Sequence, residues 1–404
     1  MPGRFPGQRG NSGLLDRDRS GVSPNLLNVG ETTTLAGRRE LRRYSRHLII
    51  PEVGLAGQER LRAARVLCIG AGGLGSPIIA YLAAAGVGRI GIVDDDVVDE
   101  TNLQRQILFA NADVGRPKVD VATERALAMN PYIAVDPIRV RLDHTNAREL
   151  VRLYDVIVDG TDNFSSRYVI NDACVLEGKP DVFGSIFRFD GQVSIFGSPG
   201  APCYRCLFPR RPPPGTVPSC AEGGVLGVLA GIVGTLQANE ALKLILGIGT
   251  PLIGMLALVD ALDTRVRHVR VERDPRCPVC GDDPTMLDLV ADDDDGEETD
   301  EDDVDPATLD ALLEERPDVR VLDVRDPHER VLGTLPNAVT IPAGELEARL
   351  HELDSATTYV VACRVGQKSL WAARRLRDAG FRRVRHLRGG FLRYAAFDDG
   401  FDVF

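Results

Sequence analysis

The chain has 404 residues, enough for two or three domains, and its 44% hydrophobic and 26% charged residues are typical of a globular protein. Its net charge of −11 is matched by the 11 carboxylates of one window, Asp292–Asp305 (DDDDGEETDEDDVD), which contains no Lys or Arg. The rest of the chain is therefore neutral overall, and its composition gives no support for a nucleic-acid partner.

Residues 1–38 are rich in Gly, Arg, Ser and Pro, and we expect a flexible leader without the apolar core of a signal peptide. The longest apolar stretch, Gly224–Leu236, is too short to span a bilayer and continues into the polar QANEALK. It is therefore predicted to be a buried core helix. Eight cysteines without an export signal favour metal binding and catalysis over disulfides. These features predict a soluble cytoplasmic protein with no membrane partner.

Residues 39–285 alternate apolar strand patterns with helical patterns, which predicts an α/β domain with a doubly wound, largely parallel sheet of the Rossmann-like kind. Asp190-Gly191 lies between two alternating runs and predicts a hairpin turn, so part of the sheet should be antiparallel and the sheet mixed. The predicted strands include RVLCIG (65–70), RIGIVDDD (89–96) and YDVIVDGTD (154–162), and the predicted helices include SPIIAYLAAAG (76–86) and KVDVATERALAMN (118–130).

Residues 286–305 are predicted to be an acidic, solvated linker, and residues 306–404 form a second, smaller α/β pattern. The linker is interpreted either as a tether that lets the second domain move or as a passive solubilising spacer. The second pattern consists of VRVLDVR (319–325), AVTIP (338–342), TYVVACRVG (358–366), SLWAARRLRDAG (369–380) and VRHLRGG (384–390).

The stretch VLCIGAGGLGS (66–76) is an apolar strand that ends in closely spaced glycines. Gly70, Gly72 and Gly75 fit the G-x-G-x-x-G pattern, and Asp94 ends the next predicted strand. Such glycines let backbone N–H groups approach phosphates at a helix N-terminus, and the carboxylate can accept hydrogen bonds from ribose hydroxyls. The pattern alone does not separate NAD(P) from ATP, and a tight turn needed only for packing is the structural alternative.

Charged residues after successive elements favour ATP. Arg105, Lys118 and Asp162 supply two cations and one carboxylate, a set that fits a phosphate clamp with a magnesium ligand. Such a clamp suits cleavage of a triphosphate with pyrophosphate as the leaving group. A dehydrogenase would need a proton donor instead, and none of the six histidines lies in a recognisable catalytic context. Taken singly, each charge could equally belong to a surface ion pair.

Five motifs in order, RYSRH, GAGGLGS, NLQRQ, GRPK and DGTDN, resemble those of the ubiquitin-activating-like adenylyltransferases of the ThiF/MoeB group, over residues 39–281. The resemblance implies that ATP and a ubiquitin-like carrier protein ending in Gly-Gly form a carrier acyl-adenylate. It also implies a homodimer, in which Arg46 reaches into the neighbouring subunit's site. By matching positions, the resemblance places Gly73 at the phosphates, Asp94 at the ribose, Asn102, Arg105 and Lys118 among the ATP contacts, and Asp162 at Mg²⁺.

Two C-x-x-C pairs, Cys203/Cys206 and Cys277/Cys280, lie about seventy residues apart. Four thiolates suit tetrahedral Zn²⁺, and a closed shell of four protein ligands indicates a structural site. The zinc that the ThiF/MoeB group carries agrees with this interpretation. Redox dithiols or idle thiols are the alternative.

Cys220 lies in the Pro/Gly-rich stretch PGTVPSCAEGGV (214–225), just before the long apolar helix. An exposed thiol near a helix N-terminus can be a nucleophile with a lowered pKa. Its position resembles the cysteine with which some relatives link covalently to the carrier. A cysteine without a catalytic role is an equal alternative.

Cys363 ends the apolar run TYVVA and begins CRVGQKS, which leads into a helix. A loop of this kind can wrap backbone N–H groups around the sulfur and, with Arg364 and Lys368 nearby, stabilise a thiolate and then a persulfide. With LDVRDPHE before it and LRGGF after it, residues 306–404 resemble a rhodanese domain. That resemblance implies that Cys363 carries a sulfane sulfur.

The two halves together resemble the MoeZ-type fusions of an adenylyltransferase with a rhodanese, a molybdopterin-synthase adenylyltransferase/sulfurtransferase family. The resemblance implies adenylation of the carrier's C-terminal glycine and then transfer of persulfide sulfur, which gives a carrier thiocarboxylate and AMP. The sulfur donor is expected to be a cysteine desulfurase or thiosulfate. The alternatives are an NAD(P)-binding oxidoreductase and a non-catalytic carrier-binding scaffold.

Overall fold

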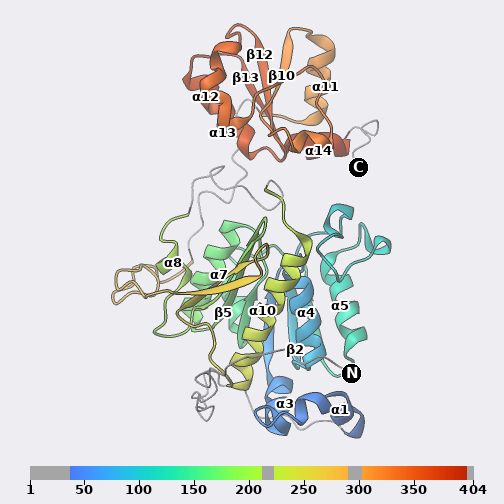
Figure 1. Cartoon of the computed structure of the whole chain (residues 1–404), viewed down its shortest axis with the longest axis vertical. Coiled ribbons are helices and arrows are strands. Elements are labelled where there is room, and N and C mark those ends of the chain that lie inside the picture. Colours follow the sequence, from blue (N-terminus) through green and yellow to red (C-terminus); the bar gives the residue numbers. More distant parts are fainter. Residues whose placement is uncertain (1–36, 212–222, 290–302, 398–404) are drawn as a thin grey trace, which may run out of the picture. The chain divides into compact units, whose positions relative to one another are not determined.

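A computed structural model describes residues 37–211, 223–289 and 303–397, and these residues form two compact units (Figure 1). The first unit is built mostly on residues 37–289 and the second on residues 303–397. Each contains its own sheet.

The first unit begins with short helices and then alternates strands with helices. Its helices are α1 (Arg38–Arg43), α2 (Ser45–Leu48), α3 (Gly54–Ala63), α4 (Gly75–Ala85), η1 (Glu100–Asn102), η2 (Asn111–Asp113), α5 (Lys118–Met129), α6 (Ala147–Arg152), α7 (Phe164–Glu177), α8 (Tyr204–Leu207) and α10 (Gly227–Leu246). Its strands are β1 (Arg65–Ile69), β2 (Arg89–Val93), β3 (Ala134–Ile138), β4 (Val156–Asp159), β5 (Asp181–Phe187), β6 (Asp190–Phe196), β7 (Met255–Asp260) and β8 (Arg265–Arg270).

The sheet of the first unit has the order β3-β2-β1-β4-β5-β6-β7-β8. The strands from β3 to β5 in this order pair in parallel, and β5 to β8 pair antiparallel. The inner strands are apolar on both faces because helices cover both, and all four residues of β4 are buried. The predicted mixed, doubly wound α/β architecture is confirmed.

Helix α10 packs against α4, β5 and β6, and small residues allow the close approach (Figure 1). A Cβ added at Gly234 would lie 2.5 Å from the Leu74 carbonyl oxygen. The helix is long and apolar enough to cross a membrane, but 56% of its most apolar window is buried inside the structure. It is therefore a core helix, as its amino-acid pattern predicts.

The hairpin between β5 and β6 turns two residues earlier than the sequence indicates. Phe187 pairs with Asp190, so the turn is Arg188–Phe189, and Arg188 has a φ of 53°. Gly191 lies within β6, where an added Cβ would be 2.4 Å from Cγ2 of Val233 on α10. The prediction of a turn at Asp190-Gly191 was wrong because this glycine serves helix packing rather than the turn.

The second unit is a five-stranded parallel sheet with the order β11-β10-β12-β13-β9. Apolar clusters cover its two faces, one around Phe381 and the other around Phe391. Its elements are β9 (Asp303–Val304), α11 (Pro306–Glu315), β10 (Val319–Asp323), η3 (Glu329–Leu332), β11 (Ala338–Thr340), η4 (Ala343–Glu345), α12 (Leu346–Arg349), η5 (Leu350–Glu352), β12 (Thr358–Ala362), α13 (Gln367–Asp378), β13 (Val384–Leu387) and α14 (Gly390–Phe397).

The end of the acidic tract is part of the second unit. Residues Asp303–Val304 pair with β13, and Asp305 caps α11 by accepting a hydrogen bond from the Thr308 N–H at 2.8 Å. Composition alone assigned these residues to the linker, because an edge strand of two residues carries no periodic signal.

Candidate functional site

The glycine loop between β1 and α4 is held tightly by its first and last glycines. Gly70 has a φ of 90° and donates its N–H to the Val93 carbonyl at 2.7 Å. A Cβ at Gly75 would lie 2.0 Å from the Gly70 carbonyl oxygen, so this position tolerates no side chain. Gly73 is half-exposed, and a Cβ there would be 3.5 Å from Cγ of Arg105. The loop therefore presents bare backbone beside an arginine.

Asp94 follows β2 directly and is fixed against the glycine loop. Its two carboxylate oxygens accept the N–H of Ala71 at 2.8 Å and the N–H of Asp96 at 2.9 Å. Burial raises the pKa of Asp94, although Lys118 and these N–H groups act in the opposite direction. An acceptor pinned in this way at the end of the second strand is suited to ribose hydroxyls.

Lys118 begins α5 and is 5% exposed. Its Nζ lies 2.7 Å from Oδ2 of Asp96, whose own side chain is 67% exposed. The ammonium is therefore desolvated close to Asp94 and held by a carboxylate that solvent can reach. A buried ammonium attracts phosphate strongly because little water screens it.

The segment after β2 supplies Arg105 and Asn102. Nη1 of Arg105 donates to the Thr101 carbonyl at 3.0 Å, and Nδ2 of Asn102 lies 3.4 Å from Oγ1 of Thr101. Gln106 in the same NLQRQ motif was not selected from the sequence. It is 4% exposed, its Oε1 has no hydrogen-bond partner among the described residues, and its Nε2 lies 3.6 Å from a Cβ built on Gly72. Its burial, which the motif does not reveal, makes it a candidate nucleotide contact.

Asp162 comes three residues after β4 and is exposed. The preceding turn is ordered by Asp159, which accepts the N–H of Thr161 at 2.8 Å and its Oγ1 at 2.6 Å. A Cβ at Gly160 would lie 3.2 Å from the Gly70 carbonyl oxygen, so the ends of β1 and β4 touch. Parallel pairing of these strands therefore brings Gly160, which precedes Thr161 and Asp162 in the chain, to the glycine loop.

Two predicted site residues are not placed in this group by the structure. Arg46 is exposed on α2 and hydrogen-bonds to none of the site residues that the structure describes. Cys220 falls outside the described residues. The structure thus brings together the glycine loop, Asp94, Arg105 and Lys118, with Asp162 on the adjoining turn.

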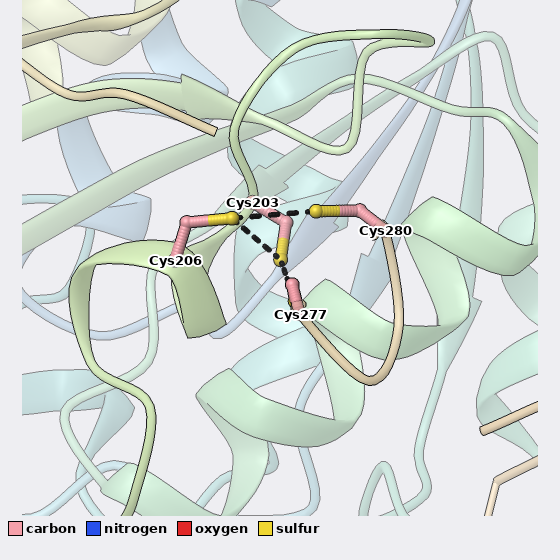
Figure 2. A group of neighbouring side chains, drawn as sticks. All are labelled: Cys203, Cys206, Cys277 and Cys280. Atoms are coloured by element: carbon pink, nitrogen blue, oxygen red, sulfur yellow. Dashed lines mark hydrogen bonds between the residues drawn. The ribbon is translucent and has the colours of Figure 1, made fainter. Parts of the chain in front are cut away.

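Cys203, Cys206, Cys277 and Cys280 converge on one point (Figure 2). Their Sγ–Sγ distances are 3.9 Å for Cys203–Cys206, 3.6 Å for Cys203–Cys277 and 3.3 Å for Cys206–Cys280. A tetrahedral ion with metal–sulfur bonds of about 2.3 Å requires sulfurs about 3.8 Å apart. The cluster therefore has a size and donor set that fit one tetrahedral, thiophilic metal ion, with all four positions filled by the protein.

The environment opposes ionisation of Cys203 and Cys280 and favours that of Cys277. Burial raises the pKa of Cys280 to about 12 and also raises that of Cys203, whereas at Cys277 burial is outweighed by the N–H groups of Cys280 and Val279, which lower the pKa. Metal binding must therefore release protons, and the affinity should rise with pH.

Cys363 follows β12 directly and is 1% exposed. Its Sγ accepts the N–H of Gly366 at 3.2 Å and lies 3.4 Å from Oγ of Ser369. Helix α13 begins at Gln367, so its N-terminal dipole is directed at this loop. The loop thus forms a cradle for a thiolate from the Gly366 N–H and the Ser369 hydroxyl, and Ser369 was not identified from the sequence.

Lys368 and Arg325 are paired with carboxylates, whereas Nε of Arg364, next to Cys363 in the chain, is buried and has no hydrogen-bond partner among the described residues. Nζ of Lys368 lies 3.5 Å from Glu329 and 3.8 Å from Asp326. Arg325 is buried with Asp323 and stacks on Phe391, with its Cζ 4.0 Å from the ring centroid. The charged residues of the LDVRDPHE segment are therefore largely paired with one another or with neighbouring side chains of the second unit.

Comparison with known proteins follows the division into two units. The ThiF family model matches residues 44–279, and the Rhodanese-like domain model matches residues 305–397. The chain is 56% identical over 258 residues to a Thermus thermophilus protein named sulfur carrier protein adenylyltransferase, covering 63% of this chain and 95% of that protein.

Two longer relatives span both units. The chain is 45% identical to the Mycobacterium tuberculosis protein named probable adenylyltransferase/sulfurtransferase MoeZ, covering 93% of this chain and 97% of that one. It is 39% identical to the Arabidopsis thaliana adenylyltransferase and sulfurtransferase MOCS3, covering 88% of this chain and 84% of that one.

Among solved structures, Escherichia coli MccB crystallised with ATP shares the fold, with a TM-score of 0.52 and 24% identity over 59% of this chain and 74% of that one. The chain therefore belongs to the ThiF family, in the fused form that is both an adenylyltransferase and a sulfurtransferase.

Proposed function

We propose that the chain uses ATP to adenylate the C-terminal glycine of a ubiquitin-like sulfur-carrier protein ending in Gly-Gly and then converts that glycine into a thiocarboxylate. The observation that carries the proposal is the presence of two complementary sites in one chain. The first has a bare glycine loop beside Asp94, Arg105 and Lys118. The second has a buried sulfur cradled by N–H and O–H donors.

In the first step, a carboxylate oxygen of the carrier attacks the α-phosphorus of ATP and pyrophosphate leaves. Asp94 holds the ribose, and the N–H groups near Gly73 receive the phosphates. Lys118 and Arg105 offset the negative charge that develops on the leaving group. Asp162 is the residue that would hold Mg²⁺, and a bound Mg²⁺ would neutralise phosphate charge.

In the second step, the terminal sulfur of a Cys363 persulfide attacks the acyl carbon and AMP leaves. The product is an acyl disulfide between the carrier and Cys363. A thiol reductant then cleaves its S–S bond, which releases the carrier thiocarboxylate and leaves the reductant joined to Cys363 as a mixed disulfide. The persulfide is restored by reduction and by a sulfane-sulfur donor such as thiosulfate or a cysteine desulfurase.

The four-cysteine cluster fits a structural Zn²⁺. Its thiolate-only donor set, its spacing and its lack of an open position favour zinc over a catalytic ion. The ion would join the segment at α8 to the segment after β8, which are far apart in sequence.

In a homodimer, Arg46 would contribute to the nucleotide site of the neighbouring subunit. Arg46 is exposed on α2, and large apolar side chains around it are also exposed, with Ile49 at 70%, Ile50 at 43% and Leu55 at 51%. Exposed apolar side chains grouped beside a cation are typical of a subunit interface. We place the dimer in the cytoplasm, with Arg46 reaching the nucleotide of the neighbouring subunit.

Cys220 is proposed to displace AMP from some of the carrier acyl-adenylate and to hold the carrier as a thioester. The route that the carrier serves remains one of four: molybdopterin, thiamine, cysteine or a specialised thio-metabolite.

The decisive experiment incubates candidate carriers with the protein, ATP, Mg²⁺, thiosulfate and a thiol, and measures the carrier mass. We expect a gain of about 16 Da, since sulfur replaces one oxygen of the C-terminal carboxylate. The gain should disappear without ATP and in the Cys363→Ala variant. NAD(P) binding without pyrophosphate exchange would instead support an oxidoreductase, and neither exchange nor sulfur transfer would support a scaffold.

A further inference from the structure

A buried histidine lies behind the Cys363 loop. His386 is on β13 and is 4% exposed, and it pairs in register with Val361 of β12 on one side and with Asp303 of β9 on the other. Its Nδ1 is 2.9 Å from Oδ1 of Asp303, and its Nε2 is 2.7 Å from the carbonyl oxygen of Gly366. Both ring nitrogens therefore face oxygens, in the interior of the unit.

Those two contacts require an additional proton. The Gly366 carbonyl can only accept, so Nε2 must carry a hydrogen. The Asp303 carboxylate, when charged, can also only accept, so Nδ1 must carry one as well. The pair exists either as imidazolium with carboxylate or as neutral imidazole with carboxylic acid. If that proton is lost, one of the two nitrogens faces an oxygen with no hydrogen between them, and one contact must break.

The contact with Gly366 leads directly to the reactive sulfur. Gly366 has a φ of 102°, donates its N–H to Sγ of Cys363 and accepts from His386 through its carbonyl oxygen. Oγ of Ser369 lies 2.9 Å from the same carbonyl oxygen and 3.4 Å from Sγ. A hydroxyl donates only one proton. Because His386 already supplies the carbonyl with a donor, the Ser369 hydroxyl can be directed at the sulfur.

Other charged groups on the elements packed against β13 are engaged elsewhere. On α13, Lys368 pairs with Glu329 and Asp326, and Arg377 donates to the Val384 carbonyl. After β13, Arg388 acts on Asp305. Among the described residues, Asp303 from β9 is the ionisable group that contacts His386, and Cys363 is connected to His386 through the Gly366 peptide.

We infer that His386, protonated against Asp303, is a positioning residue that holds the Gly366 peptide in the orientation needed to stabilise the Cys363 thiolate and persulfide. The inference rests on the proposed sulfur transfer for its purpose, but the geometry is independent of any substrate. It gives Asp303 a role within the second unit, although composition alone assigns this residue to the acidic tract.

The test measures two quantities against pH in the full-length chain. One is thiosulfate-to-cyanide sulfurtransfer, and the other is alkylation of the Cys363 peptide by iodoacetamide, followed by mass spectrometry. In His386→Asn we expect kcat to fall about tenfold with little change in the KM for thiosulfate, because the sulfur is displaced rather than the donor site. The alkylation profile should shift to higher pH, since the thiolate loses stabilisation.

Asp303→Asn separates positioning from general stability. The amide of this variant can donate to Nδ1 while Nε2 still donates to Gly366, so all contacts are made without the extra proton. We expect activity near the parental level at neutral pH, with the loss of activity at alkaline pH moved upward or removed. His351→Asn is the matched control, because His351 is exposed and its Nδ1 lies 3.1 Å from the Ala348 carbonyl oxygen, on a different element from Cys363.

An unchanged alkylation profile in His386→Asn, or an alkaline limb in Asp303→Asn equal to that of the parent, would overturn the inference. If His386→Asn does not fold, as judged by its thermal transition, the Asp303→Asn profile decides. If the parent chain lacks sulfurtransfer, the proposed function fails, and the alkylation profiles still test the positioning.

Discussion

The nucleotide site and the Cys363 loop solve the problem of holding negative charge in different ways. The candidate nucleotide site takes the glycine loop and Asp94 from the ends of β1 and β2, which parallel pairing brings together, and Lys118 from the start of α5, where its N–H donates to the Asp96 carbonyl. The Cys363 loop draws its direct donors from seven consecutive residues, 363–369. The first site depends on the whole sheet, whereas the second depends on one turn at the end of one strand.

The difference also appears in the chemistry of the donors. In the proposed nucleotide site, full charges on side chains would face a polyanionic substrate, and the pairing of Lys118 with Asp96 would be exchanged when that substrate binds. At Cys363, partial charges of N–H and O–H groups are fixed before any substrate arrives. A multiply charged leaving group is best stabilised by full positive charges, whereas a single sulfur anion can be stabilised by a preformed cradle of N–H and O–H dipoles.

The largest effect should come from Cys363→Ala. Sulfurtransfer should fall at least about 10³-fold, because the only sulfur carrier of the proposed reaction is removed. Pyrophosphate exchange dependent on the carrier should be unchanged, because this reaction ends before sulfur is needed. A variant that lost both activities would contradict the separation of the two sites.

Arg105→Ala should produce the reverse pattern. Pyrophosphate exchange should fall about 10²-fold through loss of one cation from the phosphate clamp, and thiosulfate-to-cyanide transfer should be unchanged. Arg267→Ala, on the exposed strand β8, is the matched control and should leave both activities intact. Equal loss in both arginine variants would show a general charge effect instead.

Removal of the bound metal should affect the first unit alone. Cys277→Ser should lower the zinc content and reduce the melting temperature of the first unit by roughly 10 °C, since metal binding contributes to folding. Cys68→Ala removes a buried cysteine outside the cluster and should keep the zinc. Calorimetry should show that the melting temperature of the second unit is unchanged. If zinc removal leaves the melting temperature of the first unit unchanged as well, the site has no structural role.

The smallest effect should come from Glu177. Hydrogen bonds from Arg152 and then Arg148 lower its pKa below the ordinary 4.5. Its stabilisation is therefore complete above pH 4.5 and is lost as the pH falls through the lowered pKa. Glu177→Gln should lower the melting temperature by at most about 3 °C at pH 7 and by less at pH 3. Glu149→Gln, which changes an exposed residue on α6, is the control: it should change the melting temperature less, and the change should depend less on pH.

The fold could be predicted from the sequence wherever apolar residues recur with the period of a strand or a helix. Site residues could be predicted wherever they lie close together in one motif. The glycine loop, the two C-x-x-C pairs and the Cys363 loop could all be selected because each is local. The hairpin turn was predicted at the wrong residues because Gly191 is needed for close packing against α10, thirty or more residues away in the sequence. Gln106, in a loop, Ser369, in a helix, and His386, in a strand, were missed because a polar residue looks ordinary in the sequence until its burial is known.

The sequence by itself determined the two α/β units, the acidic tract between them, and the residue types that adenylation and sulfur transfer need. Only the tertiary structure decided which of those residues meet. It joined Lys118 to Asp96, gathered four cysteines within bonding distance of one ion, and set Asp303 beside His386 behind the reactive sulfur. Motifs record chemistry along the chain, whereas strand order and register, which depend on long-range packing, decide what lies next to what.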